Sequence, residues 1–188
     1  MAGLLSALNQ DERWLLRYWS SKRGEGDLPR RQAIEPMEMP RLLPYLQLHA
    51  RTDDGRLLCR LSGTAIVQAM RVDTTGQYLD QAISNEAYLR RKHLFERVLD
   101  SGRPLMYRAR MTFLGVDWRL YRRLMLPLSY RGRGADMILS LVQFENEVGA
   151  AVPFMGPLID ILDCRQMSED ELGAMHGKQI DQARCYAL

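Results

Sequence analysis

The stretch Cys59-Arg60-Leu61-Ser62-Gly63-Thr64 restricts the possible folds more than any other part of the chain. Its first residues alternate between apolar and polar side chains, as in a half-buried strand, and Gly63-Thr64 then ends the strand and begins a helix. Nine residues later, Asp73-Thr74-Thr75-Gly76 has the composition of a capped turn that leads into another short helix. The sequence therefore predicts a strand followed directly by short helices.

Periodicity along the rest of the chain predicts four more strands and further helices. The expected strands are residues 45–52, 56–62, 105–114, 117–129 and 135–145, and the expected helices between the second and third are 64–71, 78–84 and 86–100. Asp53-Asp54-Gly55 is typical of a hairpin turn between the first two strands. This order predicts an α+β fold: a five-stranded antiparallel sheet with helices inserted between strands 2 and 3 and gathered on one face.

The two ends are expected to lie outside this domain. We predict an N-terminal helical extension over residues 1–28, a domain over 29–146, and a C-terminal tail over 147–188 with a short helix near 168–178. The extension contains a helix over 10–23, which Asn9 or Asp11 can cap. One face of it carries an apolar stripe: Leu4, Leu8, Leu15, Tyr18 and Trp19, widened by Trp14. We expect this stripe to form a homodimer, and the competing hypothesis is that it folds back onto its own sheet.

Composition favours a cytoplasmic protein. No apolar run approaches the roughly 20 residues that a bilayer span needs, and the N-terminus does not resemble a signal peptide. The three cysteines have neither metal nor redox spacing, which suits a reducing compartment. A net charge of +3 gives no argument for nucleic acid.

Several short motifs resemble a bacterial, alphaproteobacterial-type PAS domain family. The most specific are Arg60-Leu61-x-Gly63-Thr64 and Asp73-x-Thr75-Gly76, supported by Leu126-Pro127-Leu128, and the resemblance runs from about Trp14 to Phe144. The family pattern places glycine two positions before Asp73, where this chain has Arg71. The resemblance implies a sheet curled around a cavity that senses a small ligand or binds another protein. We therefore expect a stand-alone sensory or interaction module without its own catalytic output, which passes its signal to a partner protein.

The candidate ligand-binding residues are Arg122, Arg60, Cys59 and Met111. Arg122 shares a strand face with leucines 120, 124, 126 and 128, so its guanidinium is expected to be buried on the helix-covered side and paired. An anionic ligand, a carboxylate such as Asp73, or a bulge that reverses the alternation would each account for it. Cys59 falls on an apolar strand face, where a free cysteine usually acts as a small hydrophobic residue. Met111 belongs to a set of methionines suited to an adaptable pocket, although we favour ordinary core packing for them.

The cofactor is unknown. In haem-binding PAS domains a histidine on the equivalent helix binds iron, and His93 resembles it in position only. We expect no haem there, because Arg90, Arg91 and Lys92 indicate a solvated face. The Asn-Cys-Arg motif of flavin-binding, light-sensing relatives does not occur. His49 falls on the polar face of its strand and is expected to be exposed.

Two other functions stay open. Arg108, Arg110, Arg119 and Arg123, with Tyr107 and Tyr121 nearby, could bind single-stranded nucleic acid on a sheet face, although we favour a solvated outer face. The sequence has no Ser/His/Asp set, HExxH, GxGxxG or P-loop, so an enzyme would need a site assembled from distant residues.

Overall fold

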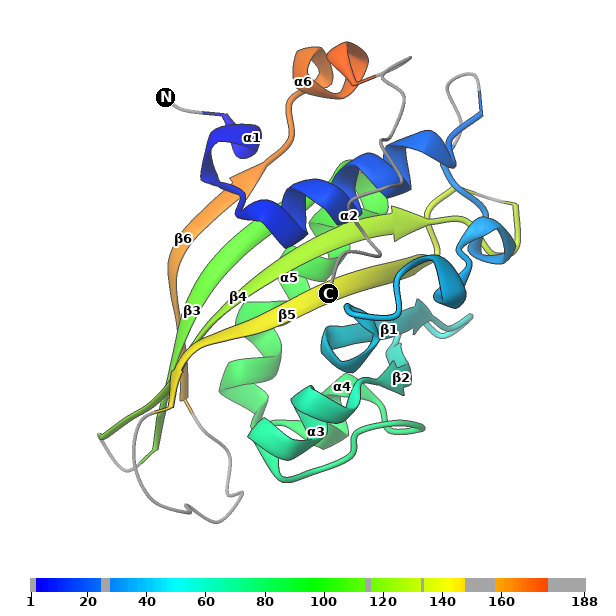
Figure 1. Cartoon of the computed structure of the whole chain (residues 1–188). Helices are drawn as coiled ribbons and strands as arrows, with labels where there is room; N and C mark the ends of the chain where they lie inside the picture. The colour runs from blue at the N-terminus through cyan, green and yellow to red at the C-terminus, as the bar shows by residue number, and fades with distance from the viewer. Residues whose placement is uncertain (1–2, 25–27, 114–115, 133, 148–157, 176–188) are drawn as a thin grey trace.

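The fold is an α+β arrangement around one antiparallel sheet. The computed structural model describes residues 3–24, 28–113, 116–132, 134–147 and 158–175. Six strands lie in the order β2-β1-β5-β4-β3-β6. Helix α2 crosses one face of this sheet and α5 crosses the other, with α3 and α4 beside β1 and β2 (Figure 1).

The five strands expected from periodicity are all present. They are β1 (Leu46–Arg51), β2 (Leu57–Ser62), β3 (Leu105–Phe113), β4 (Val116–Leu128) and β5 (Met137–Glu147). The β1–β2 hairpin turns at the predicted Asp-Asp-Gly, where Gly55 has a positive φ of 81°.

The expected strand count of five was wrong, because the C-terminal segment adds a sixth. Strand β6 (Leu158–Gln166) pairs with β3 at the edge of the sheet. The register of this pair shifts between Arg108 and Ala109: Ala109 pairs with Ile161, whereas Arg108 pairs with Asp163. The skipped residue, Leu162, is exposed. This bulge breaks the two-residue alternation, which is the signal that periodicity needs.

The helices inserted between β2 and β3 lie where they were predicted. They are α3 (Thr64–Met70), α4 (Leu79–Ala82) and α5 (Asn85–Ser101), and α6 (Glu169–Ala174) follows β6. Three short 3₁₀ helices lie between α2 and β1: Arg31–Ala33, Pro36–Glu38 and Leu43–Tyr45. The predicted C-terminal helix begins at α6, and its expected end lies outside the described residues.

The N-terminal helix is part of the core. A short α1 (Leu4–Ala7) precedes α2 (Gln10–Ser21), which begins with a capping box between Asn9 and Glu12. Leu4, Leu15 and Trp19 have no exposed surface, and the Trp19 indole donates a 2.7 Å hydrogen bond to the Pro127 carbonyl. The stripe therefore packs against its own sheet, as the competing hypothesis held. The apolar surface that motivated the dimer prediction is not exposed.

Both faces of the sheet are covered, which produces two apolar layers. On the α2 face, Leu124, Leu126 and Leu128 of β4 pack with the N-terminal helices. On the opposite face, Tyr121 and Met125 of the same strand pack with α5. Alternate residues of β4 thus enter different cores, so neither face of its central part is a solvent face.

The glycines of the two motifs have specific structural roles. A Cβ on Gly63 would collide with the Pro44 carbonyl. Only glycine therefore fits where the chain turns from β2 into α3 beside Pro44. Gly76 has a φ of 81° and donates its N–H to the Cys59 carbonyl at 2.8 Å. Arg71, at the position where the family pattern has glycine, adopts a left-handed φ of 56°. An L-residue with a Cβ costs about 1–2 kcal/mol in this conformation.

Candidate functional site

An internal cavity of about 50 Å³ lies between the sheet and helices α3, α4 and α5. Its lining includes the apolar side chains of Ile66, Met70, Leu79 and Ile83. Its polar end is formed by Gln47, His49, Arg91, Tyr121 and Arg123, among which Arg91 contacts Tyr121 and Arg123 contacts Gln47. The cavity therefore combines an apolar part with a charged part, an arrangement typical of small-molecule sites.

Two buried guanidiniums dominate the polar end. Arg91 on α5 is 7% exposed and Arg123 on β4 is 4% exposed. Arg91 Nη2 donates to the Tyr121 hydroxyl at 3.0 Å, and Arg123 Nη2 donates to Gln47 Oε1 at 2.8 Å. Arg123 Nη1 makes a longer contact of 3.4 Å with Ser140 Oγ. These oxygens belong to hydroxyl and amide groups, so no carboxylate compensates the two charges. Burial lowers the pKa of Arg91, but the phenols of Tyr121 and Tyr107 raise it by more, so that the net shift is upward.

The two arginines impose a positive field on the groups around them. Burial raises the pKa of Tyr121, but Arg91, Arg123 and the hydrogen bond with Tyr107 together lower it by more, so that the net shift is downward. The neighbouring phenol of Tyr107 lies 3.4 Å from the Tyr121 hydroxyl, and burial raises its pKa. Burial, followed by Arg123 and Arg91, lowers the pKa of His49 well below its ordinary value. His49 is therefore neutral near pH 7.

Of the four residues predicted to bind ligand, two line the cavity. Cys59 and Met111 are both buried at its wall. The Thr74 hydroxyl contacts Cys59 Sγ at 3.5 Å, and burial raises the pKa of this thiol, so it is a poor nucleophile. Arg60 is exposed on β2 and does not line the cavity.

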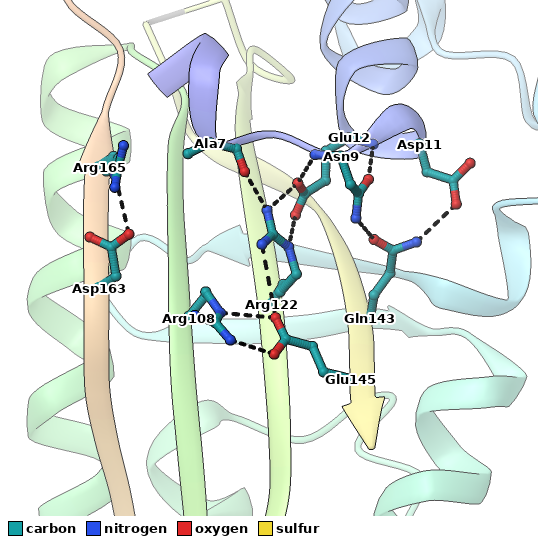
Figure 2. A network of polar contacts seen from close by, with 10 residues as sticks. All are labelled: Ala7, Asn9, Asp11, Glu12, Arg108, Arg122, Gln143, Glu145, Asp163 and Arg165. Carbon is teal, nitrogen blue, oxygen red and sulfur yellow. Dashed lines mark hydrogen bonds and ion pairs between the residues drawn. The ribbon is translucent and has the colours of Figure 1, made fainter. Parts of the chain in front are cut away.

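Arg122 lies on the opposite face of β4, toward α2. Its Nη2 and Nε donate to the Glu12 carboxylate at 2.6 Å and 3.0 Å, and Nη2 also donates to the Ala7 carbonyl at 2.7 Å (Figure 2). The predicted pairing with a carboxylate is confirmed, with Glu12 rather than Asp73 as the partner. The helix-covered side that Arg122 faces is not the side that holds the cavity.

Sequence reasoning missed the charged residues of the cavity. His49 was expected to be exposed, Arg91 to lie on a solvated helix face and Arg123 on a solvated sheet face, and all three are buried. The assumption that failed is that one face of the sheet meets water. Because helices cover both faces, a polar position in the alternation can point into a second core. Two adjacent arginines in β4, Arg122 and Arg123, were the available signal, since alternation places one on each face.

The haem hypothesis concerns His93, and the nucleic-acid hypothesis concerns Tyr107, Tyr121 and the arginines of β3 and β4. The His93 side chain is 80% exposed, lies near Glu96 on α5 and does not line the cavity. Tyr107 and Tyr121 are fully buried and have no free ring face on which a base could stack. Arg108 makes a two-pronged ion pair with Glu145 at 2.6 and 2.9 Å. Among the described residues, no cluster of His, Cys, Asp and Glu could hold a metal ion.

We predict that His49 makes the stability of the protein pH-dependent below neutrality. Its native pKa is depressed, so between that value and the unfolded value of about 6.5 the unfolded chain binds more protons. The contribution of His49 to the free energy of unfolding is fully present above about pH 6.5 and decreases by up to about 1.4 kcal/mol per pH unit as the pH falls.

Urea unfolding between about pH 7.5 and pH 5.5 measures this effect. The wild type and His93→Gln should lose stability more steeply than His49→Gln, because His93 is exposed. Equal slopes for wild type and His49→Gln would show that His49 does not titrate with folding.

The fold agrees with the comparison with known families. The profile of the PAS domain family matches residues 9–143, which is most of the chain and includes α2. The chain therefore belongs to the PAS domain family. Membership of this family suggests a sensory or interaction module, and PAS domains are generally not catalytic. A comparison with curated proteins gives no match. Within the described residues, no helix is long and apolar enough to cross a membrane.

Proposed function

We propose that this chain is a cytoplasmic sensory module that binds a small ligand in the cavity between the sheet and α3–α5 and signals to a partner protein without catalysis of its own. The observation that supports the proposal is a cavity whose lining combines hydrogen-bonding groups with apolar side chains. Such a cavity can orient a ligand and bury most of its surface. The free thiols of Cys59 and Cys164 are consistent with a reducing compartment.

The ligand hypothesis is preferred over the two alternatives for specific reasons. The raised pKa of Cys59 and the absence of carboxylates from the described lining provide no acid–base or nucleophilic pair. The aromatic residues needed to stack bases are in the core. Dimerisation through the N-terminal stripe is not part of the proposal, because that stripe is buried within its own chain.

Native mass spectrometry of freshly purified protein, followed by a ligand-observed NMR screen of small molecules, tests the proposal. Ala82 lines the cavity, so Ala82→Leu should fill part of it and abolish binding of the retained or screened compounds. Ala174→Leu adds the same atoms at an exposed position of α6 and should leave binding unchanged. Circular dichroism confirms that both variants fold.

Compounds that bind the wild type and Ala82→Leu equally would contradict the proposal. In that case the function would shift to protein interaction. An apolar surface groove lined by Met39, Leu43 and Leu61, among others, supports that second candidate, since Leu61 is 46% exposed.

A further inference from the structure

Two positive charges share the polar end of the cavity without a matching negative group. Arg91 and Arg123 make no ion pair with any described carboxylate, and the described cavity lining contains no aspartate or glutamate. In contrast, the half-buried Arg122 on the other face of β4 is paired with Glu12. The chain therefore pairs this arginine with a carboxylate of its own and leaves two more deeply buried arginines without one beside a cavity.

Burying a cation without an anion is unfavourable, so two such arginines beside a cavity indicate that an anionic ligand binds there. Removing a guanidinium from water costs several kcal/mol unless an anion and hydrogen bonds compensate. His49, the other titratable base at this end, is neutral, and the Tyr107 phenol is neutral as well. The Tyr121 hydroxyl is the group of the lining that comes closest to serving as a counter-ion, and it already accepts a hydrogen bond from Arg91.

Both arginines keep donors for an incoming group. Each guanidinium has five N–H groups in a planar fork. The Nε atoms of Arg91 and Arg123 are buried and have no hydrogen-bond partner among the described residues. Both side chains also line the cavity, together with Gln47, which holds Arg123 in place. A carboxylate accepts two parallel hydrogen bonds from such a fork.

The size and polarity of the cavity restrict the anion. A volume of about 50 Å³ is far below the several hundred Å³ of sites for drug-sized molecules. The lining residues Ile66 and Met70 on α3 and Ile83 at the end of α4 would contact an apolar group but could not satisfy a second charge. We propose that the cavity binds a short-chain aliphatic monocarboxylate, with its carboxylate at Arg91 and Arg123 and its alkyl chain toward α3 and α4. This inference rests on the proposed function and specifies its ligand class.

The test compares matched anionic and neutral probes on the full chain. Acetate, propionate and butyrate are titrated by calorimetry at constant ionic strength, beside acetamide, propionamide and butyramide of the same shape. The carboxylates should bind saturably and the amides should not. Arg123→Met and Arg91→Met should each weaken binding about 10- to 100-fold, the loss expected for charge-assisted hydrogen bonds. Arg17→Met, at an exposed position of α2, is the matched control and should bind as the wild type does.

A second measurement needs no ligand and separates an empty anion site from an internally compensated one. If the charge of Arg123 is unpaired in the free protein, Arg123→Met should leave the urea midpoint unchanged or raise it. A markedly lower midpoint would show that a group of the chain itself, such as an ionised Tyr121, neutralises the arginine, and would overturn the inference.

The outcomes distinguish the inference from the proposed function. A retained neutral or cationic ligand, lost in Ala82→Leu, would support the function and overturn the carboxylate. Sulfate or chloride binding as tightly as propionate would also overturn it, because the apolar end would then contribute nothing. Carboxylate binding that persists in both arginine variants would place the anion elsewhere.

Discussion

Truncating Trp19 to alanine should lower the free energy of unfolding by about 3–5 kcal/mol, the range for loss of a fully buried aromatic side chain. The indole has no exposed surface and donates a hydrogen bond to the Pro127 carbonyl in β4. The variant would therefore create a large cavity and also leave a buried carbonyl unpaired. Equilibrium urea unfolding followed by circular dichroism measures this loss.

Trp14→Ala is the matched control, because Trp14 lies on the same helix but is only partly buried and stacks on Tyr18. It should cost clearly less than Trp19→Ala. Deleting residues 1–23 extends the same prediction: the leucines of β4 would meet water, and the truncated chain should aggregate or lose cooperative unfolding. A stable, monomeric truncated chain would show that the N-terminal helices are an appendage rather than part of the core.

Replacing Arg122 with methionine should cost about 3–5 kcal/mol, because Glu12 would then be a buried carboxylate without its cation. The Glu12 side chain is 1% exposed, and its carboxylate also accepts the Asn9 N–H at 2.8 Å in the capping box. The Glu12 side chain thus caps α2 and also attaches it to β4, so the loss of Arg122 weakens the packing of α2 on the sheet.

A double-mutant cycle checks the physical cause. Glu12→Gln keeps an acceptor for Asn9 and removes the charge, so adding it to Arg122→Met should recover at least half of the loss. Arg108→Met removes the more exposed pair with Glu145 and should cost about 1 kcal/mol or less. Equal costs for Arg108→Met and Arg122→Met, with no recovery in the double variant, would contradict this account.

Together, the two sides of β4 suggest how the domain is organised. Arg123 lines the cavity, whereas the preceding residue in the chain, Arg122, anchors the N-terminal helix on the opposite face. Anion binding at Arg123 and the attachment of α2 therefore involve adjacent residues of one strand. The ligand titration and the Arg122 variants can be combined to measure any coupling free energy between the two sites.

Local sequence determined most of the secondary structure and the family. Two-residue alternation located β1 to β5, and helical periodicity with an Asn9 cap located α2, because these signals depend only on neighbouring residues. The Gly63 and Gly76 motifs are recognisable for the same reason: close backbone approach and a left-handed φ leave no room for other residues. The carboxylate partner of Arg122 was also expected, since a buried guanidinium requires one.

The tertiary structure decided which surfaces meet water, and the candidate site depends on this. The sixth strand was hidden by its bulge at Leu162, and the apolar stripe of α2 was compatible with either a second copy or its own sheet. Alternation separates Arg122 from Arg123 but does not say what covers each face. Only the packing of α2 on one face and of α5 on the other turns Arg91, Arg123 and His49 from apparent surface residues into the charged end of a cavity, because burial depends on contacts between segments far apart in the chain.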